Sequence, residues 1–368
     1  MLAGIGGLAA GAILAGHAQA GPLNPPPGPI APTPGPEPRI AINSTNTPGD
    51  ADSLFKISQP GSYYLTQNVT GVASRHGIEI AASRVTIDLN GFQLAGIAGS
   101  RHGIATTASG LTDIEICNGT VTGWGESGID TSSVNTQNSV IRNIRSNMNA
   151  QRGLDIGAGS LIEGCTVHNN LSGGVDAQNR CIIARTTAHN NTGRGIATAF
   201  TSVVTECVST ENTTDGIAIN GGSVVNRCSV VSNTGNGIFV SSGGIVENCN
   251  CRNNLGDGIL VSGLSTVANN SCVFNGNGST GAGVHATGEN NRIEGNQCSG
   301  NVRNFDIDIA GNFIVRNTAS AVGNTVVNWD IAAGNTVLII SAATSFGVFG
   351  DSGGSSPGST NPNANYTY

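Results

Sequence analysis

The hydrophobic positions of this chain repeat every 21 residues from Gly153 to about Cys272. Each repeat begins with a glycine followed by a branched aliphatic residue, and a second aliphatic position, an asparagine and a cysteine recur in the same register. The marker glycines are Gly153, Gly174, Gly195, Gly216, Gly237 and Gly258, and the second aliphatic column is Ile162, Ile183, Val204, Val225, Val246 and Val267. Several columns that share one period indicate a solenoid, in which each repeat stacks on the previous one.

Each repeat favours strands over helices. In residues 237–240, inward apolar residues alternate with outward residues. A second apolar run in each repeat, such as residues 223–225, is short and β-branched. At ~3.3 Å per residue, 21 residues make one turn of three short strands, and stacked turns pair in parallel ~4.8 Å apart. Because parallel crossovers are right-handed, the pattern predicts an all-β, single-stranded right-handed parallel β-helix of about twelve turns.

The first 20 residues are expected to direct export, and the next 18 to form a linker. Residues 1–20 read as a signal peptide, since an apolar Gly/Ala-rich stretch leads to Ala18-Gln19-Ala20 before Gly21, as at a cleavage site. Residues 21–38 hold nine of the 13 prolines and should form an extended linker. We therefore expect a periplasmic, cell-surface or extracellular protein without a transmembrane span in the mature chain.

One folded domain is expected over residues 39–349. Residues 50–65 contain three of the few aromatic side chains and are the natural cap for the first open edge of the solenoid. An apolar run up to residue 349 is the expected second cap. Residues 350–368 are rich in Gly, Ser, Pro and Asn and are expected to be a disordered tail.

The composition restricts which partners and which cysteine chemistry are expected. The net charge of −7 argues against a nucleic-acid partner. Nine cysteines in an exported chain would normally indicate disulfides. Here most of them fall in inward columns, which favours buried free thiols. No Cys-x-x-Cys motif is present, so no metal site is expected from the cysteines.

Candidate chemistry lies on the outward positions, two residues after each marker glycine. Asp130, Asp155 and Asp176 occupy this position on consecutive turns. Neighbouring carboxylates would lie ~5 Å apart and the outer pair ~10 Å apart, which brackets the separations in retaining and inverting glycosidases. Packed carboxylates also raise one another's pKa or bind a hard cation. We therefore expect a catalytic aspartate ridge or a calcium site, with no cofactor required.

Residues beside this ridge are expected to contact a substrate. The candidates are Trp124, Arg152, His102, His76 and Glu79, with the Trp124 ring as a surface for stacking a sugar. The alternative is a solvated acidic stripe that discourages edge-to-edge association.

Three other sets of residues carry weaker expectations. Asp306 and Asp308 could bind calcium weakly, and Asp88, Glu115, Arg142 and Glu163 are expected to form an outward ion-pair column. Phe239 and Leu260 are apolar at outward positions and could form a self-association patch.

Two segments carry a family resemblance. Residues 46–57 (NTPGDADSLFKI) and 77–92 (GIEIAASRVTIDLNGF) resemble the exported right-handed parallel β-helix repeat proteins of the pectin-lyase-like superfamily, a largely uncharacterised group found in planctomycete-like bacteria. The resemblance implies the fold and export, and it implies no particular activity.

Three functions stay open at this stage. The first is binding or scaffolding of a polysaccharide or cell-envelope glycan through the outward strand face. The second is a polysaccharide lyase or glycoside hydrolase that uses Asp130, Asp155 and Asp176. The third is a purely structural surface protein.

Overall fold

The computed structural model describes residues 38–133, 135–276, 280–323, 325–341, 348–350 and 361–368. The chain divides into two units, Met1–Pro38 and Arg39–Tyr368, and the fold belongs to the second. The expected signal peptide, and the linker up to residue 37, lie outside the described residues. Within the described ranges every regular element is a strand, and no helix there is long and apolar enough to cross a membrane.

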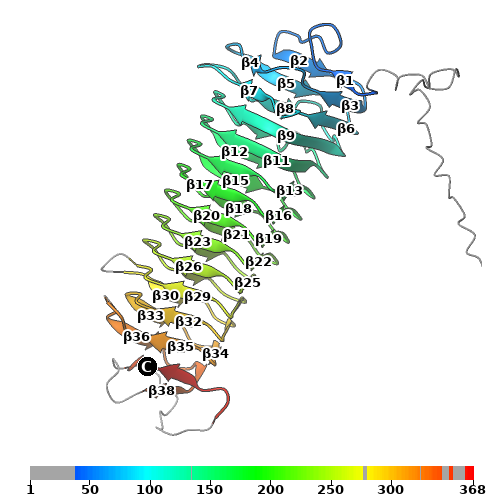
Figure 1. Cartoon of the computed structure of the whole chain (residues 1–368). Coiled ribbons are helices and arrows are strands. Elements are labelled where there is room, and N and C mark those ends of the chain that lie inside the picture. The colour runs from blue at the N-terminus through cyan, green and yellow to red at the C-terminus, as the bar shows by residue number, and fades with distance from the viewer. Residues whose placement is uncertain (1–37, 134, 277–279, 324, 342–347, 351–360) are drawn as a thin grey trace, which may run out of the picture. The chain divides into compact units, whose positions relative to one another are not determined.

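The second unit is a parallel β-helix with three strand faces (Figure 1). Face 1 is a single 14-stranded parallel sheet. Its strands are β2 (Ser53–Ile57), β5 (His76–Ile80), β8 (Ile104–Thr106), β10 (Ile129–Asp130), β12 (Arg152–Ile156), β15 (Gly173–Ala177), β18 (Ile196–Thr198), β21 (Ile217–Ile219), β24 (Ile238–Val240), β27 (Ile259–Val261), β30 (Ala282–Ala286), β33 (Arg303–Ile307), β36 (Val327–Ile331) and β39 (Val348–Gly350).

Faces 2 and 3 share a second, 26-stranded sheet, because β9 (Ile114–Thr122) and β11 (Val140–Asn147) run across both of them. The remaining strands of face 2 are β1 (Ile40–Ala41), β3 (Gly61–Tyr64), β6 (Val85–Asp88), β13 (Leu161–Glu163), β16 (Ile182–Ala184), β19 (Val203–Thr205), β22 (Val224–Asn226), β25 (Ile245–Glu247), β28 (Thr266–Ala268), β31 (Arg292–Glu294), β34 (Phe313–Val315) and β37 (Thr336–Val337). Those of face 3 are β4 (Val69–Thr70), β7 (Gln93–Ala95), β14 (Thr166–His168), β17 (Thr187–His189), β20 (Val208–Thr210), β23 (Ser229–Val231), β26 (Asn250–Arg252), β29 (Ser271–Val273), β32 (Gln297–Ser299), β35 (Thr318–Ser320), β38 (Ile339–Ser341) and β40 (Asn365–Thr367).

The β-helix is longer than the sequence pattern predicts. Face 1 carries 14 strands, which makes about 14 turns instead of about twelve. The additional turns lie at the ends, where the glycine marker is lost. At the amino end, residues 53–64 form a regular first turn, since β2 pairs with β5 and β3 pairs with β6. The segment expected to be a separate cap therefore belongs to the stack itself.

The predicted inward column is confirmed. Val225 is fully buried and pairs in register with Val204 on one side and Val246 on the other. All nine cysteines are free in the structure, and all but Cys117 are buried, as expected for side chains in inward columns.

A ladder of buried asparagines runs along the bend between faces 3 and 1. Asn170, Asn191, Asn212, Asn233 and Asn254 are at most 1% exposed. Each side-chain amide donates to the Oδ1 of the next asparagine at 2.9–3.0 Å, and that Oδ1 also accepts the backbone N–H of the preceding asparagine. The second amide hydrogen reaches a backbone carbonyl, as from Asn191 to Val167 at 3.2 Å. All polar atoms of these buried side chains are thus satisfied.

The expected disordered tail is wrong at its carboxyl end. Strand β40 inserts between β35 and β38 and pairs in parallel with both. Asn365 is fully buried there and extends a second asparagine ladder, since Asn317 donates to its Oδ1 at 2.9 Å. Pairing gives partners to backbone groups that β35 and β38 would otherwise leave open. Residues 351–360 lie outside the described ranges.

The register can be tested with one substitution made at two adjacent positions. Val225→Asp places an unpaired charge in the core and should abolish folding, whereas Val224→Asp places the same charge on the outer surface of β22 and should leave the fold intact. Far-UV circular dichroism and thermal unfolding measure both. Equal tolerance of the two substitutions would contradict the register.

Candidate functional site

One column of outward side chains runs the length of face 1. The strand registers align, in order, Lys56, Glu79, Ala105, Asp130, Asp155, Asp176, Ala197, Ala218, Phe239, Leu260, His285, Asp306 and Asp330. The column is charged towards both ends and apolar in the middle. The expected stacking of Asp130, Asp155 and Asp176 on consecutive turns is therefore present in the strand register.

Glu79 and His76 lie near the amino end of this column and are both 4% exposed. Glu79 accepts a hydrogen bond from Thr107 at 2.6 Å and pairs with Lys56 at 2.7 Å. The His76 ring stacks on His102 with centroids 5.3 Å apart. Burial, followed by the charges of Arg101 and His102, lowers the pKa of His76 to about 4. These groups are enclosed, so they offer little surface to a substrate.

Asp130 is committed to the turn that follows β10. It accepts hydrogen bonds from the Ser132 backbone at 2.8 Å and from the Ser133 hydroxyl. His102 Nε2 lies 2.8 Å from Glu126 and 3.5 Å from Asp130. The carboxylate expected to be catalytic therefore organises a loop in this structure.

Trp124 is not a stacking platform, and this expectation is corrected. The side chain is 1% exposed and its Nε1 donates to the Leu94 carbonyl at 3.1 Å. The ring fills space left by glycines, because a Cβ at Gly77 would lie 2.7 Å from the indole. The turns next to Trp124 carry glycine at the marker position. A large aromatic residue beside such glycines was the sequence signal for this burial.

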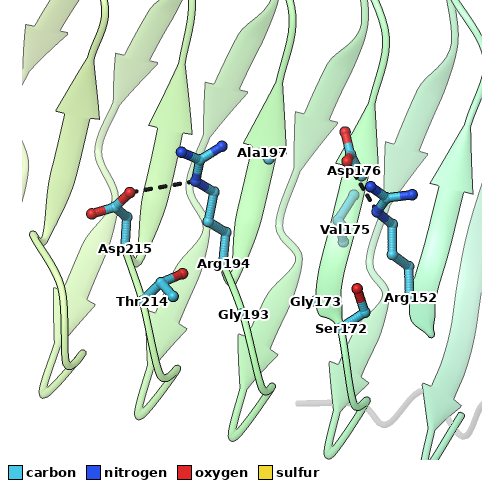
Figure 2. Close-up of a pocket in the computed structure, with 10 residues that line it drawn as sticks. All are labelled: Arg152, Ser172, Gly173, Val175, Asp176, Gly193, Arg194, Ala197, Thr214 and Asp215. Atoms are coloured by element: carbon cyan, nitrogen blue, oxygen red, sulfur yellow. Dashed lines mark hydrogen bonds and ion pairs between the residues drawn. The ribbon is translucent and has the colours of Figure 1, made fainter. Parts of the chain in front are cut away.

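Arg152 bridges the two other aspartates of the ridge, as Figure 2 shows for Asp176. Its Nη1 lies 2.7 Å from Asp155 and its Nε lies 3.0 Å from Asp176. Burial raises the pKa of Asp176, and the charge of Asp155 raises it further, while Arg152 opposes both effects. The guanidinium occupies the position between the carboxylates where a cation would bind, so it relieves their repulsion without a metal ion.

A depression of about 370 Å³ opens beside this arginine (Figure 2). Its lining residues are Arg152, Ser172, Gly173, Val175, Asp176, Gly193, Arg194, Ala197, Thr214 and Asp215. Gly173 creates the space, since it occupies the same column as Arg152 and Arg194 but has no side chain. Arg194 pairs with Asp215 at 3.4 Å.

The depression continues along the column. A second hollow of about 180 Å³ shares Asp176, Arg194 and Ala197 with the first and reaches Phe239. Sequence reasoning missed Arg194 and Asp215, although each stands immediately before a marker glycine, at the same position as Arg152. Applying that position to every repeat would have identified them.

A cluster of acids around His285 lies nearer the carboxyl end of face 1. His285 Nδ1 lies 2.9 Å from Asp257 Oδ2, and its Nε2 lies 3.1 Å from Asp308 and 4.0 Å from Asp306. Arg303 pairs with Asp306 at 3.4 Å. The hollow at this cluster measures about 510 Å³. Of this group, only Asp306 and Asp308 were expected to act together; His285 sits 25 residues after Leu260, outside the 21-residue step.

The environment of this cluster favours protonation. Burial alone would lower the pKa of His285, but the hydrogen bond and charge of Asp257, with Asp308 and Asp306, raise it to about 9. Burial raises the pKa of Asp306 to about 6. His285, Asp306 and Asp308 present ligand atoms within 4.8 Å of one another. They could hold a divalent cation once His285 loses its proton.

The family comparison supports the fold. The family described as "Right handed beta helix region" matches residues 68–245 and 156–298. Among solved structures, the A-module of the Azotobacter vinelandii mannuronan C-5 epimerase AlgE6 is 15% identical, with 84% of this chain and 90% of that chain covered and a TM-score of 0.48. The Dettilon tailspike protein is 16% identical, with 86% and 60% covered and a TM-score of 0.49. At these values neither structure bears on the chemistry of this chain. Among curated proteins, none matches its sequence.

The His285 cluster makes a prediction about pH. The folded state holds the His285 proton more tightly than the unfolded state does, so its stabilising effect is complete below the ordinary pKa of about 6.5. That effect is lost as the pH rises through about 9. We expect the free energy of unfolding to fall by on the order of 1–2 kcal/mol over this window, after allowance for solvent screening.

Urea unfolding at a series of pH values measures this dependence. His285→Gln should reduce this fall in the free energy of unfolding, whereas His189→Gln, on face 3, should leave the fall unchanged. Identical slopes for wild type and His285→Gln would show that the cluster does not hold the proton.

Proposed function

The chain belongs to the right-handed β-helix family, and from this premise we propose that it is an exported protein that binds an extended glycan along face 1. The contact region is the depression between Arg152 and Arg194 and its continuation to Phe239. The single observation that carries the proposal is this connected and open surface, which continues across successive turns of face 1.

The shape of the surface suits a polymer. Sites for small apolar ligands are concave cavities lined mainly by hydrophobic residues. Here the two hollows share residues and follow the stacked turns, so a chain-like ligand could lie across several of them.

The chemistry of the surface suits hydroxyl-rich units. Arg194 and Asp215 supply donors and acceptors at one side of the first hollow, and Arg152 and Asp176 do so at the other (Figure 2). Such groups recognise hydroxyls and carboxylates through directed hydrogen bonds. Phe239 is half-buried at the far end and offers an apolar ring for stacking. The net charge of −7 disfavours a polyanion as long and dense as a nucleic acid.

Binding is favoured over catalysis by the aspartate ridge. Asp155 and Asp176 share the Arg152 guanidinium, and Asp130 is held by the turn after β10. Here one guanidinium pairs with both carboxylates, so neither is free to act alone on a substrate.

The test is a binding screen on acidic and neutral polysaccharides, with calcium and with a chelator. For the polysaccharide that binds, Arg194→Ala should weaken affinity about tenfold, the usual effect of losing a hydrogen bond to a charged group. Gly173→Gln should fill the hollow and weaken binding at least as much. The Cβ of a glutamine at this position would lie 3.4 Å from the nearest backbone oxygen, so the fold accommodates the substitution.

Arg252→Ala, an exposed arginine on face 3, is the matched control and should bind as wild type does. Equal affinity of all three variants, or absence of binding to every polysaccharide, would refute the proposed site. Release of shortened or unsaturated products by the wild type would favour the enzymatic alternative.

A further inference from the structure

Face 2 carries a continuous stripe of exposed aliphatic residues. The stripe consists of Val140, Leu161, Ile182, Val203, Val224 and Ile245, which pair in register on six consecutive turns. Ile182 is 47% exposed and Ile245 is 40% exposed, and the other four are half-buried. Stacking at ~4.8 Å makes the stripe ~25 Å long.

The stripe has defined ends. Before it the same column holds Glu115, and after it the column holds Thr266 and then Arg292. Single exposed aliphatic side chains are normal on protein surfaces, whereas contiguous apolar rows bounded by polar residues are typical of interaction sites. The stripe is also separate from the depression, which lies on face 1.

One edge of the stripe is lined by charges of alternating sign. Each of the six turns contributes one, in the order Arg142, Glu163, Arg185, Glu206, Arg227 and Glu247. Arg142, Glu163 and Glu247 share one strand column, whereas Arg185, Glu206 and Arg227 lie one residue after that column. Within the chain, Arg142 lies 3.6 Å from Glu163, Arg185 pairs with Glu163 and lies 3.6 Å from Glu206, and Arg227 lies 3.6 Å from Glu206.

Three of these charged residues adopt a backbone conformation that their residue types disfavour. Arg185, Glu206 and Arg227 have φ values of 49°, 55° and 53°, in the left-handed region. The equivalent position on most other turns carries the residues that favour this conformation, namely Asn118, Asn143, Gly164, Asn248, Asn269 and Gly295. Arginine and glutamate at these three turns therefore cost conformational free energy that asparagine or glycine would not.

We infer that the stripe packs face to face against the same stripe of a second copy of this chain, with the two stacks antiparallel about a two-fold axis that runs along the strands. This axis keeps each column on itself and reverses the order of the turns. Arg142 then faces Glu247 of the second copy and Arg185 faces Glu206, each pair within one column. Glu163 and Arg227 lie on facing turns in adjacent columns. Because six alternating charges read in reverse have the opposite sign at every turn, the whole edge is complementary to itself.

The alternative two-fold axis, along the stack, lacks this complementarity. It would place the charged edge against the opposite edge of the stripe, which is formed by Asn138, Gly159, Arg180, Thr201, Gly222 and Gly243. That edge has one charged residue in six turns. The antiparallel arrangement is therefore the one that the charges select.

The expected dimer is weak and reversible. A stripe ~25 Å long and one strand wide buries less than a standard interface of ~1,600 Å². Face 1 stays uncovered in both copies, so this assembly stands independently of the glycan site.

Sedimentation velocity of the full chain between about 1 and 200 micromolar tests the association. The wild type should show a concentration-dependent dimer. Ile182→Glu should raise the dissociation constant at least about tenfold, whereas Leu171→Glu, at a residue 63% exposed outside the stripe, should leave it unchanged. Circular dichroism confirms that each variant is folded. A wild type that stays monomeric, or an Ile182→Glu variant that dimerises as well as wild type does, overturns the inference.

A mixing experiment tests the symmetry. Arg185→Glu and Glu206→Arg each place like charges opposite one another in their own dimers, so each variant alone should be monomeric. In a mixed dimer, every one of these contacts joins opposite charges, so the mixture should dimerise. Failure of the mixture to associate, while the wild type dimerises, rules out the antiparallel register.

Discussion

The buried asparagine ladder is the interaction on which the rest of this structure depends. A bend that returns the chain from face 3 to face 1 turns backbone groups towards the core, where water cannot reach them. Each asparagine supplies two donors and an oxygen that accepts two hydrogen bonds, and the next turn supplies the complementary set. The cost of burying one polar side chain is thus met only if the turn above and the turn below are in place. This requirement keeps the bend of each turn aligned with the bend of its neighbours, both at the 21-residue steps and at the 26-residue step from Asn275 to Asn301.

That regularity explains where chemistry can occur on the molecule. Inward columns are fixed by packing and by the ladder, so variation is confined to outward positions and to the residues just before the marker glycines. On face 1 the position before the marker glycine holds Arg152, Gly173 and Arg194 on successive turns, so two charged side chains flank one open position. The same regularity brings acids from successive turns to within a few ångströms of each other. The structure resolves the resulting repulsion in two ways, with a guanidinium at Asp155 and Asp176 and with a protonated imidazole at Asp257 and Asp308.

Periodicity carried most of the fold prediction, because a residue such as Val225 is determined by its column alone. Prediction from sequence was weaker at positions whose surroundings differ from those of the equivalent position on other turns. Trp124 is buried because glycines on neighbouring turns leave room for the ring, a three-dimensional condition that no single position reveals. Strand β40 joins the sheet after a composition typical of disorder, because its partners β35 and β38 are more than 20 residues away in sequence. The His285 cluster escaped notice since a longer turn displaces it from the 21-residue step.

The charged edge of face 2 has a consequence for how such a chain can change its length in evolution. A solenoid tolerates gain or loss of a whole repeat, because the flanking turns present the same surfaces to each other. A series of alternating signs is complementary to its own reversal only when the number of members is even. Loss of one repeat between Arg142 and Glu247 would leave five charges that no longer alternate, and reversal would then set at least one pair of like charges against each other. In this segment, neighbouring repeats could therefore be gained or lost in pairs without loss of self-recognition, whereas gain or loss of a single repeat would introduce like-charge contacts.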